Sequence, residues 1–178
     1  LGLLIISVIT FIVFLGNKRL KLEIALRKTA EKKIKFVAEH DPVTKLPNRG
    51  LLDDRLAVAI SAHEREQVKF ALLFIDLDKF KSVNDQHGHH IGDALLINIA
   101  SALKSVVRKS DTVSRFGGDE FVILLRDNID VDNINQLCEQ LLTSIQQPFD
   151  LYGREFYIST SIGVSLWPED AKQPETLI

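Results

Sequence analysis

Two adjacent glycines between two apolar runs constrain the fold more than any other feature of the sequence. Gly117 and Gly118 separate residues 112–116 from residues 121–125. This pattern favours a β-hairpin, because the tight turns that join neighbouring strands need positive φ angles. Two acids follow the glycines directly. At the tip of an ordinary hairpin such acids would only be solvated.

A third acid changes the interpretation of this turn. Asp76 ends an almost wholly apolar run, residues 70–75, which is typical of a buried central strand. If the carboxyl end of that strand lies beside the hairpin, Asp76, Asp119 and Glu120 converge. Carboxylates that close together repel one another unless a cation lies between them, and hard oxygen ligands suit Mg²⁺ that carries nucleotide phosphates.

The order of the predicted elements supplies this juxtaposition. Apolar periodicity predicts a helix over 51–60, a strand at 69–76, a helical turn at 79–84, a helix at 93–108, strands at 112–116 and 121–125, a helix at 130–147 and a strand at 156–167. From the first strand onward this is the split βαβ order of an α+β fold, ferredoxin-like or palm-type, with helices packed on an antiparallel sheet. Right-handed crossovers make the first two strands parallel, with the third strand antiparallel between them. The hairpin turn is then expected at the same sheet edge as Asp76.

Three motifs in this sequence resemble those of one protein family. Residues 115–121 resemble the signature of the GGDEF family of diguanylate cyclases, residues 76–85 its second motif, and residues 41–49 the usual start of its domain. The second motif continues with Gly88, His89, Gly92 and Asp93. The resemblance covers residues 40–178, which we predict to be the domain. It implies the same fold and the condensation of two GTP into cyclic di-GMP and pyrophosphate by a homodimer.

The resemblance also implies a metal site and a catalytic set. Divalent cations, Mg²⁺ or Mn²⁺, would be held by Asp76, the Leu77 carbonyl and Asp119, and would bridge the triphosphate. Glu120 would either hold a second cation or receive the proton of the attacking hydroxyl. The two glycines would let a ligand approach their backbone closely, although they can also serve only to turn a hairpin. The implied catalytic residues are Gly117, Gly118, Asp119 and Glu120.

Substrate binding is assigned by the same resemblance to Asn84, Asp93, Phe80, Lys81 and His89. Asn84 and Asp93 would read guanine, because a carboxylate accepts from N1–H and N2–H while an amide reads the O6 or N3 edge. Phe80 and Lys81 would offer backbone N–H groups to the phosphates, with the Lys81 side chain on phosphate or in solvent. His89 would shape the loop beside the base. Asp93 has an alternative role as the N-cap of the following helix.

Nearby polar residues have simpler interpretations. Asp85 is expected to be a structural helix cap. The spacing of His87, His89 and His90 fits no common zinc site, and the chain has a single cysteine, so we predict no metal there.

Arg108 and Asp111 form an Arg-x-x-Asp sequence just ahead of the signature, where many members of the family carry a product-inhibition site. Arginine binds phosphate bidentately and stacks on guanine, so these residue types suit cyclic di-GMP as a feedback inhibitor. The alternative is an arginine favoured by the dipole of the preceding helix, followed by a solvated aspartate.

The first segment of the chain is apolar. Residues 1–16 carry no charge, and Lys18, Arg19 and Lys21 follow them directly. A truncated transmembrane helix, a signal-peptide core and a buried globular helix compete as explanations. Basic residues after the run rather than before it favour the transmembrane helix, with the remainder of the chain in the cytoplasm. We therefore predict a location at the inner (cytoplasmic) membrane.

Residues 17–39 are charged and lack glycine and proline, which favours a cytoplasmic linker helix. One narrow apolar stripe runs along it, formed by Leu22, Leu26, Ala30, Ile34 and Val37. Such a seam suits a short parallel coiled coil between two chains. A lone solvated helix is the alternative.

Composition bears on one class of partner. The chain has 22 basic and 24 acidic residues, so its net charge predicts no nucleic-acid partner. The one cysteine, Cys138, cannot form an intrachain disulfide and is expected to be a core residue.

One feature separates this chain from the usual family domain. The family's domain normally continues into one more helix, whose basic residues contact the triphosphate, whereas this chain ends at residues 175–178. We therefore expect a fragment of a longer protein that is poorly active or inactive alone. Residues 46–49 and 165–170 resemble members with a downstream EAL phosphodiesterase domain. The alternative function is a non-catalytic module that senses GTP or cyclic di-GMP and regulates such a domain, but the intact acids and glycines favour the enzyme.

Overall fold

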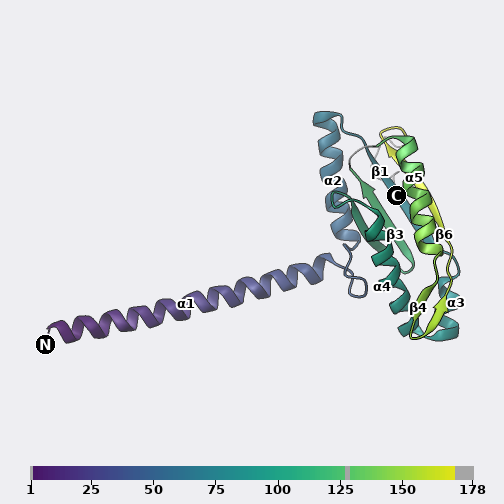
Figure 1. The fold of residues 1–178 in the computed structure, drawn as a ribbon. Helices are drawn as coiled ribbons and strands as arrows, with labels where there is room; N and C mark the ends of the chain where they lie inside the picture. The colour runs from purple at the N-terminus through teal and green to yellow at the C-terminus, as the bar shows by residue number, and fades with distance from the viewer. Residues whose placement is uncertain (1, 127–128, 171–178) are drawn as a thin grey trace. The chain divides into compact units, whose positions relative to one another are not determined.

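The computed structural model describes residues 2–126 and 129–170, with the side chains of residues 3–13 and 15 left undescribed. The chain divides into two compact units, Leu1–Ala38 and Glu39–Ile178, and each is considered by itself (Figure 1). The predicted chain end at residues 175–178 lies outside the described residues.

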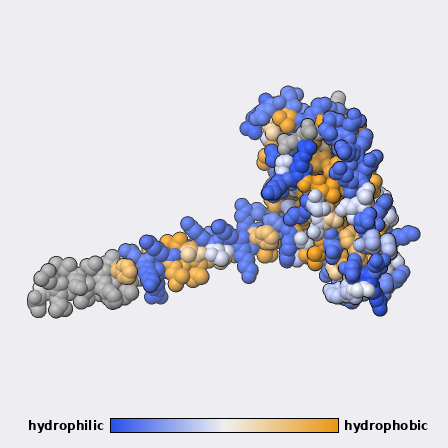
Figure 2. Space-filling model, in the orientation of Figure 1, coloured by the Kyte–Doolittle hydropathy of each residue, from blue (hydrophilic) through white to orange (hydrophobic). Residues whose placement is uncertain are grey.

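The first unit consists of one helix, α1 (Gly2–Glu39), which passes from residue 16 to residue 17 without a break. The described members of its apolar stripe are exposed, with Leu22 61% and Ile34 70% accessible. Figure 2 shows apolar groups on α1 separated by charged ones. Among the described residues, no helix has the length and apolar character needed to cross a membrane, so the transmembrane helix predicted over residues 1–16 is not supported. Most side chains of that segment are undescribed.

The second unit is an α+β fold. Its elements are α2 (Arg49–Glu66), β1 (Phe70–Leu77), α3 (Phe80–His87), α4 (His89–Val106), β2 (Thr112–Gly117), β3 (Glu120–Leu125), α5 (Val131–Gln146), β4 (Phe149–Leu151), β5 (Arg154–Phe156) and β6 (Thr160–Trp167). Four strands form one sheet in the order β2-β3-β1-β6, and every neighbouring pair is antiparallel. The predicted insertion of the third strand between the first two, antiparallel to both, is confirmed.

Alternation along β1 divides the core between the two faces of this sheet. Leu73 and Ile75 belong to a large cluster with residues of α4 and α5, whereas Phe70 and Leu72 belong to a smaller cluster with Leu52 and other residues of α2. Successive side chains of a strand point to opposite faces, so a continuous apolar run can fill both clusters. β1 is therefore a rigid, doubly covered central strand that ends at Asp76 and Leu77.

Several boundaries differ from the prediction, and the helix predicted over 51–60 extends over Arg49–Glu66. The turn predicted at 79–84 is the helix Phe80–His87, and the helix predicted from residue 93 begins at His89. The strand predicted over 156–167 starts only at Thr160, because a separate hairpin, β4–β5, precedes it. This hairpin reverses at Tyr152 and Gly153, whose φ angles of 55° and 76° fit a tight two-residue turn.

Cys138 agrees with its predicted role. It is half-buried on α5 and packs against the larger cluster, and burial raises the pKa of its thiol.

Candidate active site

The carboxyl end of β1 and the β2–β3 turn meet at one edge of the sheet. In the strand register, Asp76 lies opposite Glu120 of β3 and opposite Ser161 of β6. The Leu77 N–H donates to the Asp119 carbonyl oxygen, with 3.4 Å between nitrogen and oxygen. The structure therefore brings together Asp76, Asp119 and Glu120, which we call the carboxylate edge.

Negative charge accumulates at the carboxylate edge. The pKa of Asp76 is raised by partial burial and by the negative charges of Asp119 and Asp78. Over residues 2–126 and 129–170, no lysine, arginine or histidine forms an ion pair with a member of the carboxylate edge. Neighbouring carboxylates without a cationic partner favour the binding of an external cation.

These residues fit a divalent cation as partial ligands. Carboxylate and carbonyl oxygens are the hard donors that Mg²⁺ and Mn²⁺ prefer. No group of three or more His, Cys, Asp or Glu residues in the described chain is placed as a complete metal site, so the convergence is looser than a closed three-acid cluster. A cation here would take its other ligands from water and phosphate, as Mg²⁺ does in nucleotide sites.

The backbone conformation favours glycine at only one of the two glycine positions of the turn. Gly118 has a φ angle of +50°, which side-chain-bearing residues rarely adopt, and thus serves the turn itself. Gly117 has no such angle, and a Cβ atom built on it would meet no atom within 4 Å. Among the described residues, neither a positive φ angle nor close packing requires glycine at position 117, where the β2–β3 register also shifts. Its missing side chain leaves open space beside the backbone, next to the carboxylate edge.

Arg115 holds the β2–β3 turn in place through hydrogen bonds to its backbone and to the loop before α2. Its Nε and Nη2 atoms donate to the Gly118 carbonyl oxygen at 3.0 and 2.7 Å, and its Nη1 atom donates to both carboxylate oxygens of Asp41 at 3.1 Å. The Arg115 N–H also donates to the Pro47 carbonyl oxygen at 3.0 Å. The loop before α2 is thereby tied to the turn. Arg115 was not predicted to have this role, because its partner is 74 residues away in the chain.

The Asp41 carboxylate differs from that of Asp76 because it accepts several hydrogen bonds and forms an ion pair. Burial alone would raise the pKa of Asp41, but hydrogen bonds from the Thr44 N–H and hydroxyl, both 2.7 Å, and from Arg115 outweigh it and lower the pKa. The side chains of Asp41 and Arg115 are only 14% and 13% exposed. This ion pair is therefore a structural element of the site.

The predicted guanine readers lie where α3 meets α4. A Cβ atom on Gly92 would come within 2.0 Å of the Asn84 Oδ1 atom, so the two helices approach closely only because residue 92 is glycine. This contact brings Asn84 next to the turn of α4 that carries the exposed Asp93. The alternative role of Asp93 is wrong, because the N-cap of α4 is Gly88 and Asp93 lies inside the helix. Asp85 likewise lies inside α3 and caps neither helix, so its predicted capping role is also wrong.

The predicted phosphate donors stand at the start of α3. This helix begins at Phe80, and its N-cap, Lys79, makes no side-chain capping bond, which leaves backbone N–H groups available to an anion. Phe80 is buried and anchors the first turn, whereas Lys81 and His89 are exposed. The roles of Lys81 and His89 stay predictions.

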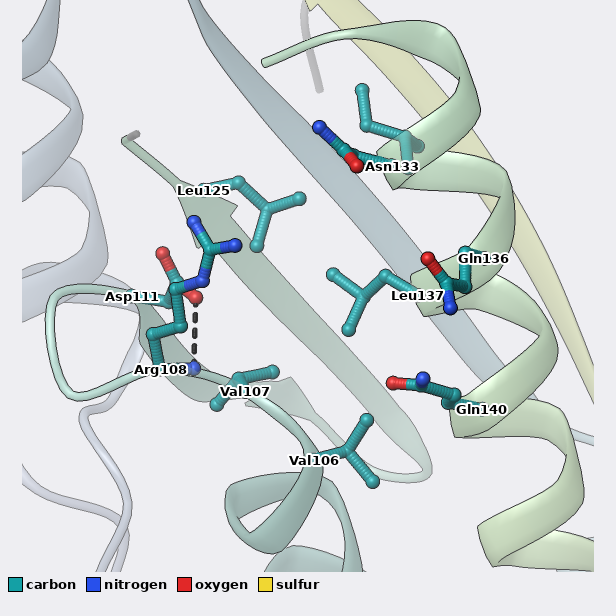
Figure 3. A pocket seen from close by; sticks show the side chains of 10 residues that line it. Val106, Val107, Arg108, Asp111, Leu125, Asn133, Gln136, Leu137 and Gln140 are labelled. Atoms are coloured by element: carbon teal, nitrogen blue, oxygen red, sulfur yellow. Dashed lines mark hydrogen bonds between the residues drawn. The ribbon is translucent and has the colours of Figure 1, made fainter. Parts of the chain in front are cut away.

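Arg108 and Asp111 follow the end of α4 and line a cavity of about 210 Å³ there. Figure 3 shows them facing Asn133, Gln136 and Gln140 of α5 across it. The Arg108 N–H donates to the Asp111 carboxylate at 3.0 Å, so Asp111 is half-buried and bonded rather than freely solvated. In the described chain, no acid forms an ion pair with the Arg108 guanidinium.

Comparison with known proteins agrees with the motifs. Residues 38–178 match the family described as "Diguanylate cyclase, GGDEF domain". The bifunctional diguanylate cyclase/cyclic di-GMP phosphodiesterase MucR of Pseudomonas aeruginosa is 42% identical over 98% of this chain and 26% of its own length. Diguanylate cyclase TpbB of the same species is 39% identical over 79% of this chain and 33% of its own length. This chain thus spans about a quarter to a third of these relatives.

Solved structures are similar as well. A structure comprising only the GGDEF domain of TpbB has a TM-score of 0.74 and 39% identity, over 78% of this chain and 81% of that one. The GGDEF domain of DgcB from Caulobacter crescentus, in complex with c-di-GMP, has a TM-score of 0.68 and 26% identity, over 72% of this chain and 75% of that one. Sequence, fold and motif positions lead to one conclusion: the chain belongs to the GGDEF diguanylate cyclase family.

Proposed function

We propose that this chain is the cyclase domain of a diguanylate cyclase, which condenses two GTP into cyclic di-GMP and two pyrophosphates. The observation that carries the proposal is the carboxylate edge, which has no ion-pair partner among the described residues and lies beside the open space at Gly117. Membership of the family, and relatives named as diguanylate cyclases, support it.

The residues at the edge suggest a division of labour. Asp76, the Leu77 carbonyl and Asp119 would hold Mg²⁺ or Mn²⁺, which offsets phosphate charge and aligns the attacking 3′-hydroxyl. The backbone at Gly117 and Gly118 would lie against the phosphates.

Further groups would complete the substrate site. The first N–H groups of α3, at Phe80 and Lys81, would donate to phosphate oxygens, while Asn84 and Asp93 bind the guanine edge. His89, exposed at the start of α4, would stand beside the base.

The chemical step is a phosphoryl transfer between two bound nucleotides. The 3′-oxygen of one GTP attacks the α-phosphorus of the other, the bond to pyrophosphate breaks, and the hydroxyl proton leaves. Glu120, which is exposed at the start of β3, would accept that proton or act as a further cation ligand. Repeating the transfer in the other direction closes the ring.

Because each domain would hold one GTP, the reaction requires two domains face to face. We assign dimer formation to residues 17–39, where the exposed apolar stripe of α1 suits a parallel coiled coil. Sedimentation of the chain, compared with a Leu26→Glu and Ile34→Glu double variant, tests this assignment. A dimer that persists in the double variant would contradict it.

Product inhibition is proposed at Arg108 and Asp111. The Arg108 guanidinium, which pairs with no acid among the described residues, lies beside a cavity with several polar lining residues, and it suits a phosphate and guanine of cyclic di-GMP. In a version extended past residue 178, Arg108→Ala should weaken inhibition by cyclic di-GMP without abolishing turnover. An unchanged inhibition curve would contradict the assignment.

Location at the inner membrane is also a proposal. It rests on the uncharged residues 1–16 and on the basic Lys18, Arg19 and Lys21 that follow. Fractionation of cells that express the chain with and without residues 1–16 tests it. Equal recovery of both forms outside the membrane fraction would contradict the proposal.

The alternative is a module that binds GTP or cyclic di-GMP without turnover and regulates a second domain, such as an EAL phosphodiesterase. MucR, which is named as both cyclase and phosphodiesterase, makes this alternative specific.

GTP turnover with Mg²⁺ separates the two functions. It is measured in the 178-residue chain and in a version extended past residue 178, each with an Asp119→Asn counterpart. Cyclic di-GMP formation that Asp119→Asn abolishes would support the enzyme. GTP binding without product in the extended version would favour the alternative. The expectation that the 178-residue chain is poorly active is tested by the same comparison.

A further inference from the structure

A second cavity lies away from the carboxylate edge and from Arg108. It has a volume of about 660 Å³ and is walled on one side by the α3–α4 junction and on the other by the β4–β5 hairpin. Its lining includes His87, His90, Tyr152, Arg154 and Phe156. We call it the hairpin pocket. None of its lining residues has a role in the proposed function, and its volume falls within the range of small-molecule sites.

Strand pairing makes the pocket side of the hairpin cationic. Leu151 pairs with Arg154, Phe149 with Phe156, and Asp150 with Glu155. Residues directly opposite each other share a face, and alternate residues point to opposite faces. Arg154 and Phe156 thus point to the pocket, whereas both acids of the hairpin point away from it.

The two acids also have partners of their own. The Asp150 carboxylate accepts from the Gly153 N–H at 2.9 Å, and the Glu155 carboxylate accepts from the Tyr157 hydroxyl at 2.8 Å. In the part of the chain that the structure describes, Arg154 forms no ion pair. The pocket therefore offers a guanidinium and two imidazoles with no carboxylate in its lining.

Aromatic rings flank these donors. Phe156 meets the His87 ring edge-to-face, with ring centroids 5.1 Å apart, and the Tyr152 ring lies 6.5 Å from that of His90. Tyr152 is 79% exposed and has a φ angle of 55°, a position where glycine or asparagine would be less strained. Packing does not explain a large exposed ring at this strained position.

We propose that the hairpin pocket binds a nucleotide, with its phosphate on Arg154 and its base against the ring of Tyr152 or Phe156. A guanidinium binds phosphate through two parallel hydrogen bonds, and an aromatic side chain can stack on any of the nucleotide bases. The imidazole N–H groups of His87 and His90 supply further donors. This site is independent of the proposed cyclase function.

Adenosine monophosphate is the probe of choice, because the proposed catalytic site reads guanine. Its titration into the chain, followed by NMR, should shift the signals of His87, His90 and Tyr152. Arg154→Gln and Tyr152→Asn should each weaken binding by roughly tenfold, since each removes one charge-assisted or stacking contact. Asparagine suits the left-handed position of residue 152, so the turn is kept. Glu155→Gln, on the opposite face of the hairpin, is the matched control and should bind as the original chain does.

Several results would overturn the proposal. One is the absence of shifts in the pocket up to about 5 mM nucleotide, where even millimolar affinity is visible. Another is equal affinity in Arg154→Gln, Tyr152→Asn and the original chain. Binding that survives these changes but is lost in Asp93→Asn would place the nucleotide at the catalytic edge instead. Equal affinity for inorganic phosphate alone would reduce the site to one for simple anions.

Discussion

Asp41 and Asp76 belong to the same candidate site, yet their surroundings shift their pKa values in opposite directions. Asp41 accepts hydrogen bonds from Thr44 and Arg115, and its pKa is lowered. Asp76 lies near Asp78, Asp119 and Glu120, has no ion-pair partner among the described residues, and its pKa is raised. The first carboxylate stabilises the fold that positions the turn. The second destabilises the fold slightly unless a cation arrives, which is the property expected of a ligand-binding group.

The largest difference should appear in turnover. In a version extended past residue 178, Asp76→Asn should lower cyclic di-GMP formation on the order of 100-fold or more, because the charged ligand for the cation is lost. Asp41→Asn should cost far less activity at a temperature where it remains folded. Equal losses in the two variants, measured by product formation at saturating GTP, would remove the distinction.

Stability should show the reverse order. Arg115→Ala should lower the free energy of unfolding by about 2 kcal/mol, because it leaves the largely buried Asp41 carboxylate and the Gly118 carbonyl without their donor. Urea unfolding measures this change. Arg49→Ala, which removes a cation placed 4.4 Å from the centre of the Phe116 ring, is a control near the same turn and should cost less than about 1 kcal/mol. A smaller loss for Arg115→Ala than for this control would show that the contact does not brace the turn.

The pH dependence of stability should separate the two aspartates further. A carboxyl whose pKa is lower in the folded state contributes stability that is complete above its usual value, here 3.8, and is lost as the pH falls through the lower folded value. Unfolding followed from pH 6 to about pH 2 should therefore show a decline that is shallower in Asp41→Asn. Parallel curves for the two proteins would contradict this assignment.

The smallest effect is expected for the charge of Asp76. Because its pKa is raised in the folded state, its ionised form opposes folding, and Asp76→Asn should raise the melting temperature at pH 7 by no more than about 2 °C. The gain should vanish below pH 3.8, where the carboxyl is protonated in both states. Mg²⁺ should stabilise the original chain and leave the variant unchanged. A lower melting temperature in Asp76→Asn at pH 7 without metal would contradict the description of the edge.

The sequence alone predicts those parts of the site that depend on local patterns and topology. The apolar run before Asp76 and the glycine pair are enough to place three acids at one edge, because crossover handedness leaves few alternatives. The tie between Asp41 and Arg115 was not predicted, since it joins residues 74 positions apart and has no periodic signal. Sequence patterns also misplaced the start of α4, whose N-cap, Gly88, makes no side-chain capping bond, so Asp93 was the more obvious candidate.

The β4–β5 hairpin shows a second limit of sequence patterns. Its strands, Phe149–Leu151 and Arg154–Phe156, are too short to display a period, and Tyr152 is an unusual residue for a tight turn. The sequence-based prediction placed no element at residues 149–155 and gave Gly153 no role.

The most direct test of the central claim locates Mn²⁺-GTP on the chain. The paramagnetic ion broadens NMR signals of nearby amides, so titration of Mn²⁺ in the presence of GTP reports its position. We predict selective broadening at Leu77, Gly117 and Gly118, and its loss in Asp76→Asn. Broadening that avoids these amides, or that persists unchanged in Asp76→Asn, would contradict a metal-nucleotide site at the carboxylate edge.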